Sequence, residues 1–109
     1  MKAQVNHIAL SVKDFDWYVS FFETVCDMTI KRQKGDSPNR QLWFNEGIQL
    51  NEKDNNIQNG ERYDHIGLFT EHVSDVVEEA VKLGCRQLPG KPHWIEMPEG
   101  ILLEFKDVE

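Results

Sequence analysis

Hydrophobic and polar residues alternate with a period of two in two short stretches that are similar to each other. The first covers residues 6–12 and the second covers residues 64–70, 58 positions later. Each opens with an asparagine or aspartate followed by His-Ile. Alternation over this length is typical of a strand with one buried face. The repeat predicts a chain made of two similar modules.

Each alternating stretch is followed by apolar residues at helical spacing. The first of these helices is expected to begin at Asp14, a favourable N-cap residue, and the second near Ser74. Gly84 suits the position after the second helix, where the backbone often turns left-handed. The apolar stripes are Phe15, Tyr18, Val19, Phe22, Val25 and Cys26 in the first helix, and Val73, Val76, Val77, Ala80 and Leu83 in the second.

Three short strand-like segments follow each helix, separated by turns rich in glycine, proline and asparagine. They are predicted at 28–33, 41–45 and 48–51 in the first half, and at 86–88, 93–97 and 101–106 in the second. The resulting plan is an α+β fold of two βαβββ modules, at about 4–52 and 62–107. A module of this size buries little surface alone, so we expect one domain spanning 1–109.

The alternation also assigns each strand residue to a face, because adjacent side chains point in opposite directions. Apolar residues such as Ile8 and Leu10 should face the helix. The open face should then carry four polar side chains, namely His7, Gln49, His65 and Glu104. Two imidazoles, an amide oxygen and a carboxylate suit a divalent ion of the Zn, Ni, Co, Mn or Fe type.

Each of the four also has an ordinary structural explanation, since a single strand histidine or a glutamate in a terminal strand is more often solvated than functional. The repetition of both histidines favours the metal hypothesis. Leu102, on the same predicted face as Glu104, argues against a polar cleft there. The register of the fourth strand leaves open whether Gln49 or Asn51 would be the ligand.

Composition narrows the class of protein. The 109 residues are 39% hydrophobic and 28% charged, as in ordinary globular domains. Twelve basic and 19 acidic residues leave a net charge of −7 without a basic run, which weighs against nucleic-acid and membrane partners. The N-terminal residues lack the apolar core of a signal peptide, and Cys26 and Cys85 form no CxxC pair. We therefore expect a reduced, cytoplasmic protein.

These motifs resemble the vicinal oxygen chelate superfamily, which includes glyoxalase I, bleomycin-resistance proteins and extradiol dioxygenases. Residues 6–14 and 64–68 look like the opening strands of its two modules. The turn 98–100, followed by Glu104, looks like the approach to its last metal-binding glutamate. The resemblance implies paired βαβββ modules whose curved mixed sheets surround a metal-binding cleft, usually in a homodimer. Its ligand positions correspond to His7, Gln49, His65 and Glu104.

The same resemblance implies a divalent-metal-dependent isomerase or lyase, of glyoxalase I or epimerase type, acting on a small molecule. The ligand set is similar to that of methylmalonyl-CoA epimerases, with Ni, Zn, Co or Mn as the metal. Glu104, the only carboxylate in the set, would be the base that moves a proton next to a metal-chelated carbonyl. Trp43 and Ser11 are candidate pocket residues.

Two other functions stay open. An iron dioxygenase of the same fold would use His7, His65 and Glu104, with Gln49 as a bystander. A metal-free binding or resistance protein would need no metal-binding residues. Such members typically lack them, so the four residues found here argue against this function. The sequence also leaves some roles unassigned. Glu52, Glu71 and Glu96 are unranked as a second base, Arg40 could hold a carboxylate or be solvated, and either His93 or Trp94 faces the cleft. The site could lie in one chain or be shared by two.

Overall fold

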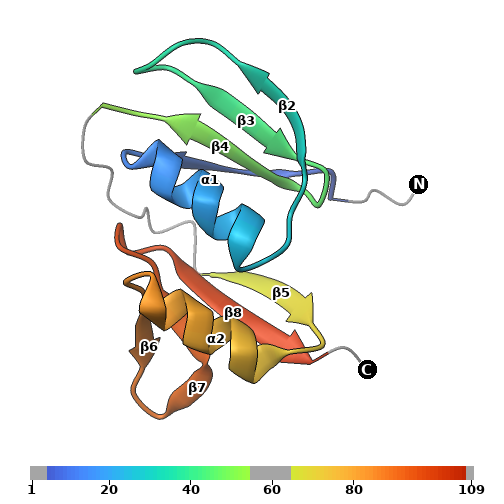
Figure 1. Cartoon of the computed structure of the whole chain (residues 1–109), viewed down its shortest axis with the longest axis vertical. Helices are drawn as coiled ribbons and strands as arrows, with labels where there is room; N and C mark the ends of the chain where they lie inside the picture. Colours follow the sequence, from blue (N-terminus) through green and yellow to red (C-terminus); the bar gives the residue numbers. More distant parts are fainter. Residues whose placement is uncertain (1–4, 55–64, 108–109) are drawn as a thin grey trace. The chain divides into compact units, whose positions relative to one another are not determined.

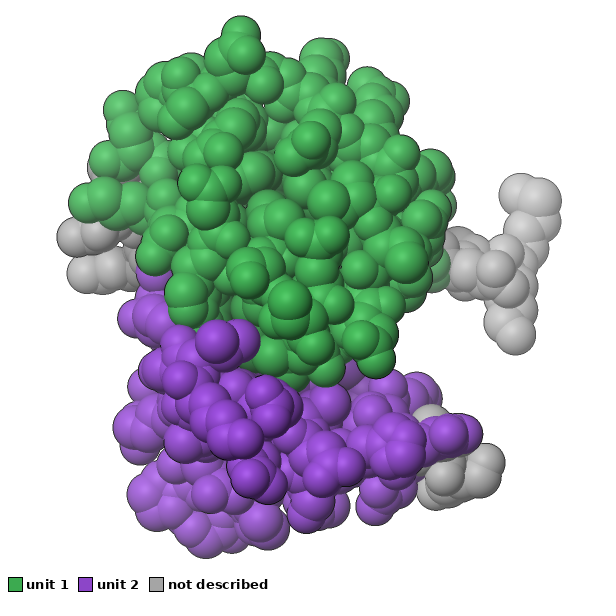
Figure 2. Space-filling view, viewed as in Figure 1, with its two compact units in different colours: residues 1–57 green, residues 58–109 purple. Residues whose placement is uncertain are grey.

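The computed structural model describes residues 5–54 and 65–107. The chain divides into two compact units, Met1–Ile57 and Gln58–Glu109, which we call unit 1 and unit 2 (Figure 2). Each contains a strand, a helix and three further strands (Figure 1). This confirms the predicted α+β fold of two βαβββ modules. The predicted module starts at residues 4 and 62, and the predicted strand start at residue 64, lie outside the described residues.

Unit 1 is a four-stranded mixed sheet with one helix on one face. Its strand order is β1-β4-β3-β2, with β1 parallel to β4 and the other pairs antiparallel. The elements are β1 (Ile8–Val12), α1 (Phe15–Thr24), β2 (Ile30–Lys34), β3 (Gln41–Phe44) and β4 (Ile48–Glu52). Helix α1 contacts β4 and buries an aromatic stripe consisting of Phe15, Tyr18, Phe21 and Phe22.

Unit 2 repeats this plan in the order β5-β8-β7-β6, with β5 parallel to β8. Its elements are β5 (Ile66–Thr70), α2 (Val73–Lys82), β6 (Arg86–Leu88), β7 (Lys91–Glu96) and β8 (Leu102–Asp107). Helix α2 packs on β6, β7 and β8 (Figure 1). The first strand and the helix of unit 2 begin 58 residues after their counterparts in unit 1, so the sequence repeat is a structural repeat.

Burial confirms the predicted assignment of faces at most positions. Ile8, which was expected to pack against the helix, is 39% exposed at the start of β1. Buried apolar side chains alternate along the strands with exposed or half-buried ones. On the helix side, the buried residues are Leu10, Val12, Leu42, Phe44, Ile48 and Leu50 in unit 1, and Ile66, Ile95, Leu103 and Phe105 in unit 2. The opposite face of each sheet is the open face. None of the helices in the described residues is long and apolar enough to span a membrane.

Some element ends differ from the prediction by one or two residues. Helix α1 begins after Asp14 as expected, but the Asp14 side chain does not cap it. Helix α2 begins one residue earlier than expected, after His72. Strand β7 starts at Lys91 and continues through Pro92, because a register shift in its pairing with β6 accommodates a residue that cannot donate a backbone hydrogen bond.

Candidate metal centre

Strand register makes Gln49 and Glu104 equivalent positions in the two units. Gln49 on β4 lies opposite Ala9 on β1, and Glu104 on β8 lies opposite Gly67 on β5. Ala9 and Gly67 are each two residues after a histidine, His7 or His65 respectively. Residues two apart share a face of a strand. Each unit therefore has a histidine directly before its first strand and an oxygen donor at the equivalent position of its last strand.

The same register shows that Gln49, and not Asn51, lies opposite Ala9. Asn51 lies opposite Ser11, one row further along the sheet. Its Oδ1 accepts hydrogen bonds from Gln41 Nε2 at 3.2 Å and from Gln49 Nε2 at 2.9 Å. Gln49 is only 8% exposed, and with its amide nitrogen engaged, its carbonyl oxygen Oε1 is the atom suited to a metal. The geometry favours Gln49 over Asn51 as the ligand.

His7 lies just before β1 and is exposed. Its Nδ1 is 2.8 Å from the side-chain oxygen Oδ1 of Asn6. A carbonyl oxygen accepts hydrogen bonds, so this contact favours the tautomer with hydrogen on Nδ1. The lone pair is then on Nε2, the atom that would bind a metal. Metal-binding histidines commonly donate a hydrogen bond from the other ring nitrogen in this way.

In unit 2, His65 and Glu104 lie together. Their closest atoms, His65 Nε2 and Glu104 Oε1, are 3.5 Å apart, and the side chains are 33% and 25% exposed. Trp94 on β7 is opposite Glu104 in the sheet, and its ring centroid is 4.4 Å from that of His65. Trp94 therefore takes the open face, whereas His93 lines a groove beside α2.

The four predicted ligands are thus divided between the units. His65 and Glu104 of unit 2 are in contact, whereas His7 and Gln49 of unit 1 contact Asn6 and Asn51 respectively. Among residues 5–54 and 65–107, no group of three or more His, Cys, Asp or Glu side chains could hold a metal ion. Trp43 and Ser11, the candidate pocket residues, are half-buried on the open face of unit 1. The guanidinium of Arg32 lies 4.9 Å from the centroid of the Trp43 ring. Nothing in the spacing of residues along the chain indicates this contact, because it depends on the pairing of β2 with β3.

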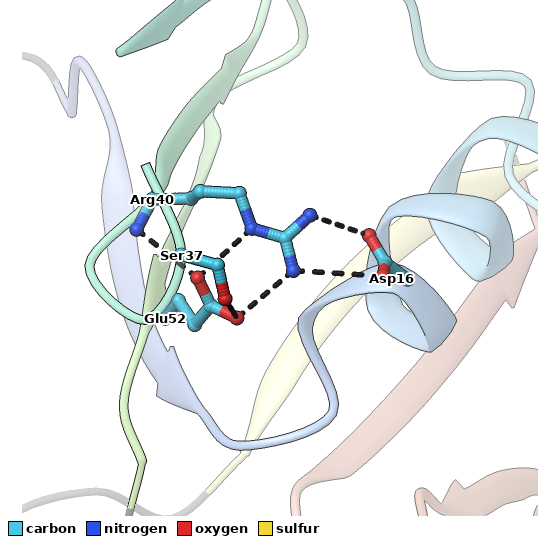
Figure 3. Close-up of polar contacts among 4 residues, drawn as sticks. All are labelled: Asp16, Ser37, Arg40 and Glu52. Atoms are coloured by element: carbon cyan, nitrogen blue, oxygen red, sulfur yellow. Dashed lines mark hydrogen bonds and ion pairs between the residues drawn. The ribbon is translucent and has the colours of Figure 1, made fainter. Parts of the chain in front are cut away.

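Glu52 and Arg40 form an ion-pair network away from the open face (Figure 3). Arg40 donates to Glu52 through Nε and Nη2, both at 2.9 Å, and to Asp16 Oδ1 through Nη1 at 2.8 Å. Ser37 donates a further hydrogen bond to Glu52. The Arg40 hydrogen bonds lower the pKa of Glu52 to about 2. A carboxylate held ionised in this way is a poor base, and Arg40 is already engaged by two carboxylates.

Glu96, another candidate base, is on the open face of unit 2 but pairs with Arg86 at 3.2 Å. Glu71 lies between β5 and α2 and is exposed. Glu104 is therefore the carboxylate that lies beside a predicted histidine ligand. The open face of unit 2 can hold a cation through His65 and Glu104 or transfer a proton through Glu104.

Comparison with known proteins adds information on the fold. No family model matches the sequence, and no curated protein matches it. The trypanothione-dependent glyoxalase I of Leishmania major aligns with a TM-score of 0.77 and 17% identity, covering 97% of this chain and 87% of that one. The fosfomycin resistance protein FosX of Listeria monocytogenes aligns with a TM-score of 0.81 and 22% identity, covering 100% and 94%.

A variant of the Listeria FosX was solved with Mn(II) and 1S,2S-dihydroxypropylphosphonic acid. It aligns with a TM-score of 0.79 and 22% identity over 96% of this chain and 92% of that one. At these identities the likeness concerns the fold. The chain has the fold of these glyoxalase I and fosfomycin resistance proteins, as the sequence motifs predicted.

Proposed function

We propose that this protein is a divalent-metal-dependent isomerase or lyase that moves a proton next to the carbonyl of a small substrate. One observation carries the proposal. In each βαβββ unit a histidine directly precedes the first strand and an oxygen donor lies at the equivalent position of the last strand, His7 with Gln49 and His65 with Glu104. The fold neighbours, which include a FosX variant solved with Mn(II), support the use of a divalent metal.

The chemistry of the donor set fits a borderline divalent ion. Two imidazole nitrogens, one amide oxygen and one carboxylate suit Ni, Zn, Co or Mn. A single carboxylate leaves positive charge on a divalent ion, which preserves its electrophilic character. The proposal covers two arrangements, in which the four ligands come from one chain or from two chains of a homodimer.

The protein's own residues would have different roles in the reaction. A bound divalent ion supplies electrophilic stabilisation of the negative charge that develops on the carbonyl oxygen. Glu104 takes the proton from the carbon next to that carbonyl. Trp94 packs against His65 and restricts the orientation of its ring. Trp43 and Ser11 line the substrate side of the open face in unit 1.

The first experiment is the metal content of protein purified without chelator or added metal. We expect near-stoichiometric Ni, Zn, Co or Mn, which is lost in His65→Ala. His72→Ala is the matched control, because His72 precedes α2 and is not one of the proposed ligands. Protein without metal that also takes up none on titration would contradict the proposal. Iron together with oxygen consumption would favour the dioxygenase alternative.

A mixing experiment separates the two arrangements of the site. His7→Ala and His65→Ala each damage one pair, and neither variant alone should bind metal. If the site is shared between chains, a mixed dimer contains one site with both pairs intact. Recovery of metal binding on mixing after subunit exchange then places the site across the dimer, and no recovery places it within one chain.

A further inference from the structure

We propose that the open face of unit 1 binds an anionic group of the ligand, a carboxylate or phosphonate, through Arg32 and Lys34. The inference rests on the proposed function in one respect, because it takes the bound anion to be part of the substrate. Its physical basis is the row-by-row order of side chains on this face, which depends on strand register.

The pairing of strands places two cations in line with the polar residues of the site. Arg32 lies opposite Trp43, which lies opposite Gln49. In the next row, Lys34 lies opposite Gln41, which lies opposite Asn51. The open-face strand residues of unit 1 are therefore Ala9, Ser11, Arg32, Lys34, Gln41, Trp43, Gln49 and Asn51.

A register shift in β2 selects Arg32 for this face. Ile30 pairs with Phe44 on the helix side, but the next paired residue is Arg32, opposite Trp43, so Lys31 is the extra residue. Without the shift, Lys31 would be opposite Trp43 and Arg32 would point to the other face. The alternation of β2 alone does not show this, because all five of its residues are exposed.

The charge on this face differs from that of the chain. None of its eight strand residues is a carboxylate, although the whole chain carries a net charge of −7. In the part of the chain that the structure describes, no carboxylate pairs with Arg32 or Lys34. Glu52, the carboxylate at the end of β4, pairs with Arg40 instead. Unpaired cations beside neutral amides favour an anionic ligand.

The position of Arg32 suits an oxyanion. Its guanidinium lies over the Trp43 ring, 4.9 Å from the centroid. A guanidinium that rests on an aromatic ring keeps the N–H groups of its edge available for two parallel hydrogen bonds to a carboxylate or phosphonate. Lys34 and Gln41 line a polar hollow of about 200 Å³ at the end of the same hairpin.

The same arrangement limits the size of the ligand. The Arg32 guanidinium lies above β3, the strand next to β4, which carries Gln49. Neighbouring strands are roughly 5 Å apart, so the anionic group would be bound about that far from the proposed metal ligand. This spacing suits a small acid whose carboxylate or phosphonate is separated from the reacting carbonyl by a few bonds.

The test measures anion binding to metal-free protein, prepared with a chelator and then dialysed. Pyruvate, methylphosphonate and neutral pyruvamide are titrated at low ionic strength while nitrogen-proton NMR spectra are recorded. We expect the two anions to give saturable shifts at the Trp43 indole and the Arg32 Nε signal. Arg32→Gln and Lys34→Gln should each weaken binding by about tenfold, since a charge-assisted hydrogen bond is lost.

Lys82→Gln is the matched control, because it removes one positive charge from α2 in unit 2 and should leave anion binding unchanged. Dispersed spectra of each variant show that it is folded. Four results would each overturn the inference. They are shifts that persist in both Arg32→Gln and Lys34→Gln, an equal loss of anion binding in Lys82→Gln, equal shifts with pyruvamide, and the absence of saturable binding. The anion that binds with the higher affinity identifies the class of ligand, carboxylate or phosphonate. Because no metal is present, failure here is separate from failure of the metal site.

Discussion

At the residue scale, the polar side chains of unit 1 fall into two groups with different tasks. Arg40, Glu52 and Asp16 satisfy one another and join the loop before β3 to β4 and to α1 (Figure 3). Gln49, on the opposite face of β4, donates a hydrogen bond from its amide nitrogen to Asn51, and we propose its side-chain oxygen as a metal ligand. Substitution of a residue in the Arg40 network should lower stability, whereas substitution of Gln49 should weaken metal binding.

Glu52 should make stability depend on pH. Its pKa in the folded protein is about 2, compared with the usual 4.5, mainly because of the hydrogen bonds from Arg40. The ionised form therefore favours folding. This contribution is fully present above the unfolded pKa and is lost as the pH falls through the folded pKa. We expect Glu52→Gln to lower the free energy of unfolding near neutral pH, with a difference from wild type that shrinks between about pH 4.5 and 2.

Urea unfolding at several pH values measures this difference. Glu23→Gln, an exposed position on α1, should change the free energy of unfolding by less than ~0.5 kcal/mol at every pH tested. A gap between wild type and Glu52→Gln that stays constant down to pH 2 would show that the ion pair does not stabilise the folded state through the Glu52 charge.

At the element scale, the two units have helices of equal length that end differently. Helix α2 is followed by Gly84 with φ +104°, as predicted, and the Cys85 N–H bonds to the Ala80 carbonyl. Helix α1 is followed by Asp27, which takes a left-handed φ of +52°. Glycine adopts this conformation without steric cost, whereas a residue with a Cβ is strained there.

The end of α1 is therefore a site where glycine should stabilise the protein. We expect Asp27→Gly to raise the free energy of unfolding by about 0.5–1 kcal/mol, because relief of strain exceeds the added entropy of the unfolded chain. Glu23→Gly, within the helix, should lower it by about 1 kcal/mol. Thermal or urea unfolding of the two variants measures this difference in sign. A loss of stability in both would mean that the Asp27 side chain contributes more than its backbone strain costs.

Most element positions could be predicted because they depend on local spacing. The period of two located β1 and β5, and the helical stripe located α1 and α2 to within one residue at their starts. The start of β2 was predicted two residues too early, at 28. Met28 looks like a strand residue, but its N–H bonds to the carbonyl of Phe22 and so closes the turn at the end of α1.

At the whole-molecule scale, the unit 2 sheet exposes an aromatic residue on its open face. Phe69 on β5 is 72% exposed, two residues after Gly67. Burial of a phenylalanine side chain contributes about 1.5–3 kcal/mol. An exposed ring next to a predicted site suits an interface, which is consistent with the homodimer that the resemblance implies.

We expect the purified protein to sediment at twice the mass of one chain. Phe69→Ser should shift the equilibrium towards the monomer, because the interface loses apolar area. Val81→Ser on α2 removes a partly exposed apolar side chain outside the open face and should leave the mass unchanged. Sedimentation equilibrium measures all three proteins. A wild-type protein that is monomeric at high concentration, with and without metal, would contradict the dimer prediction.

The sequence by itself determined the βαβββ repeat and the common side of the unit 2 sheet on which His65 and Glu104 lie, because alternation and helical spacing depend on the nearest residues in the chain. Only the tertiary structure decided the partners across the sheets. It placed Gln49 rather than Asn51 in the row of Ala9, Trp94 against His65, and Arg32 over Trp43. These contacts depend on strand register and on one bulge, which arise from packing between segments distant in the sequence.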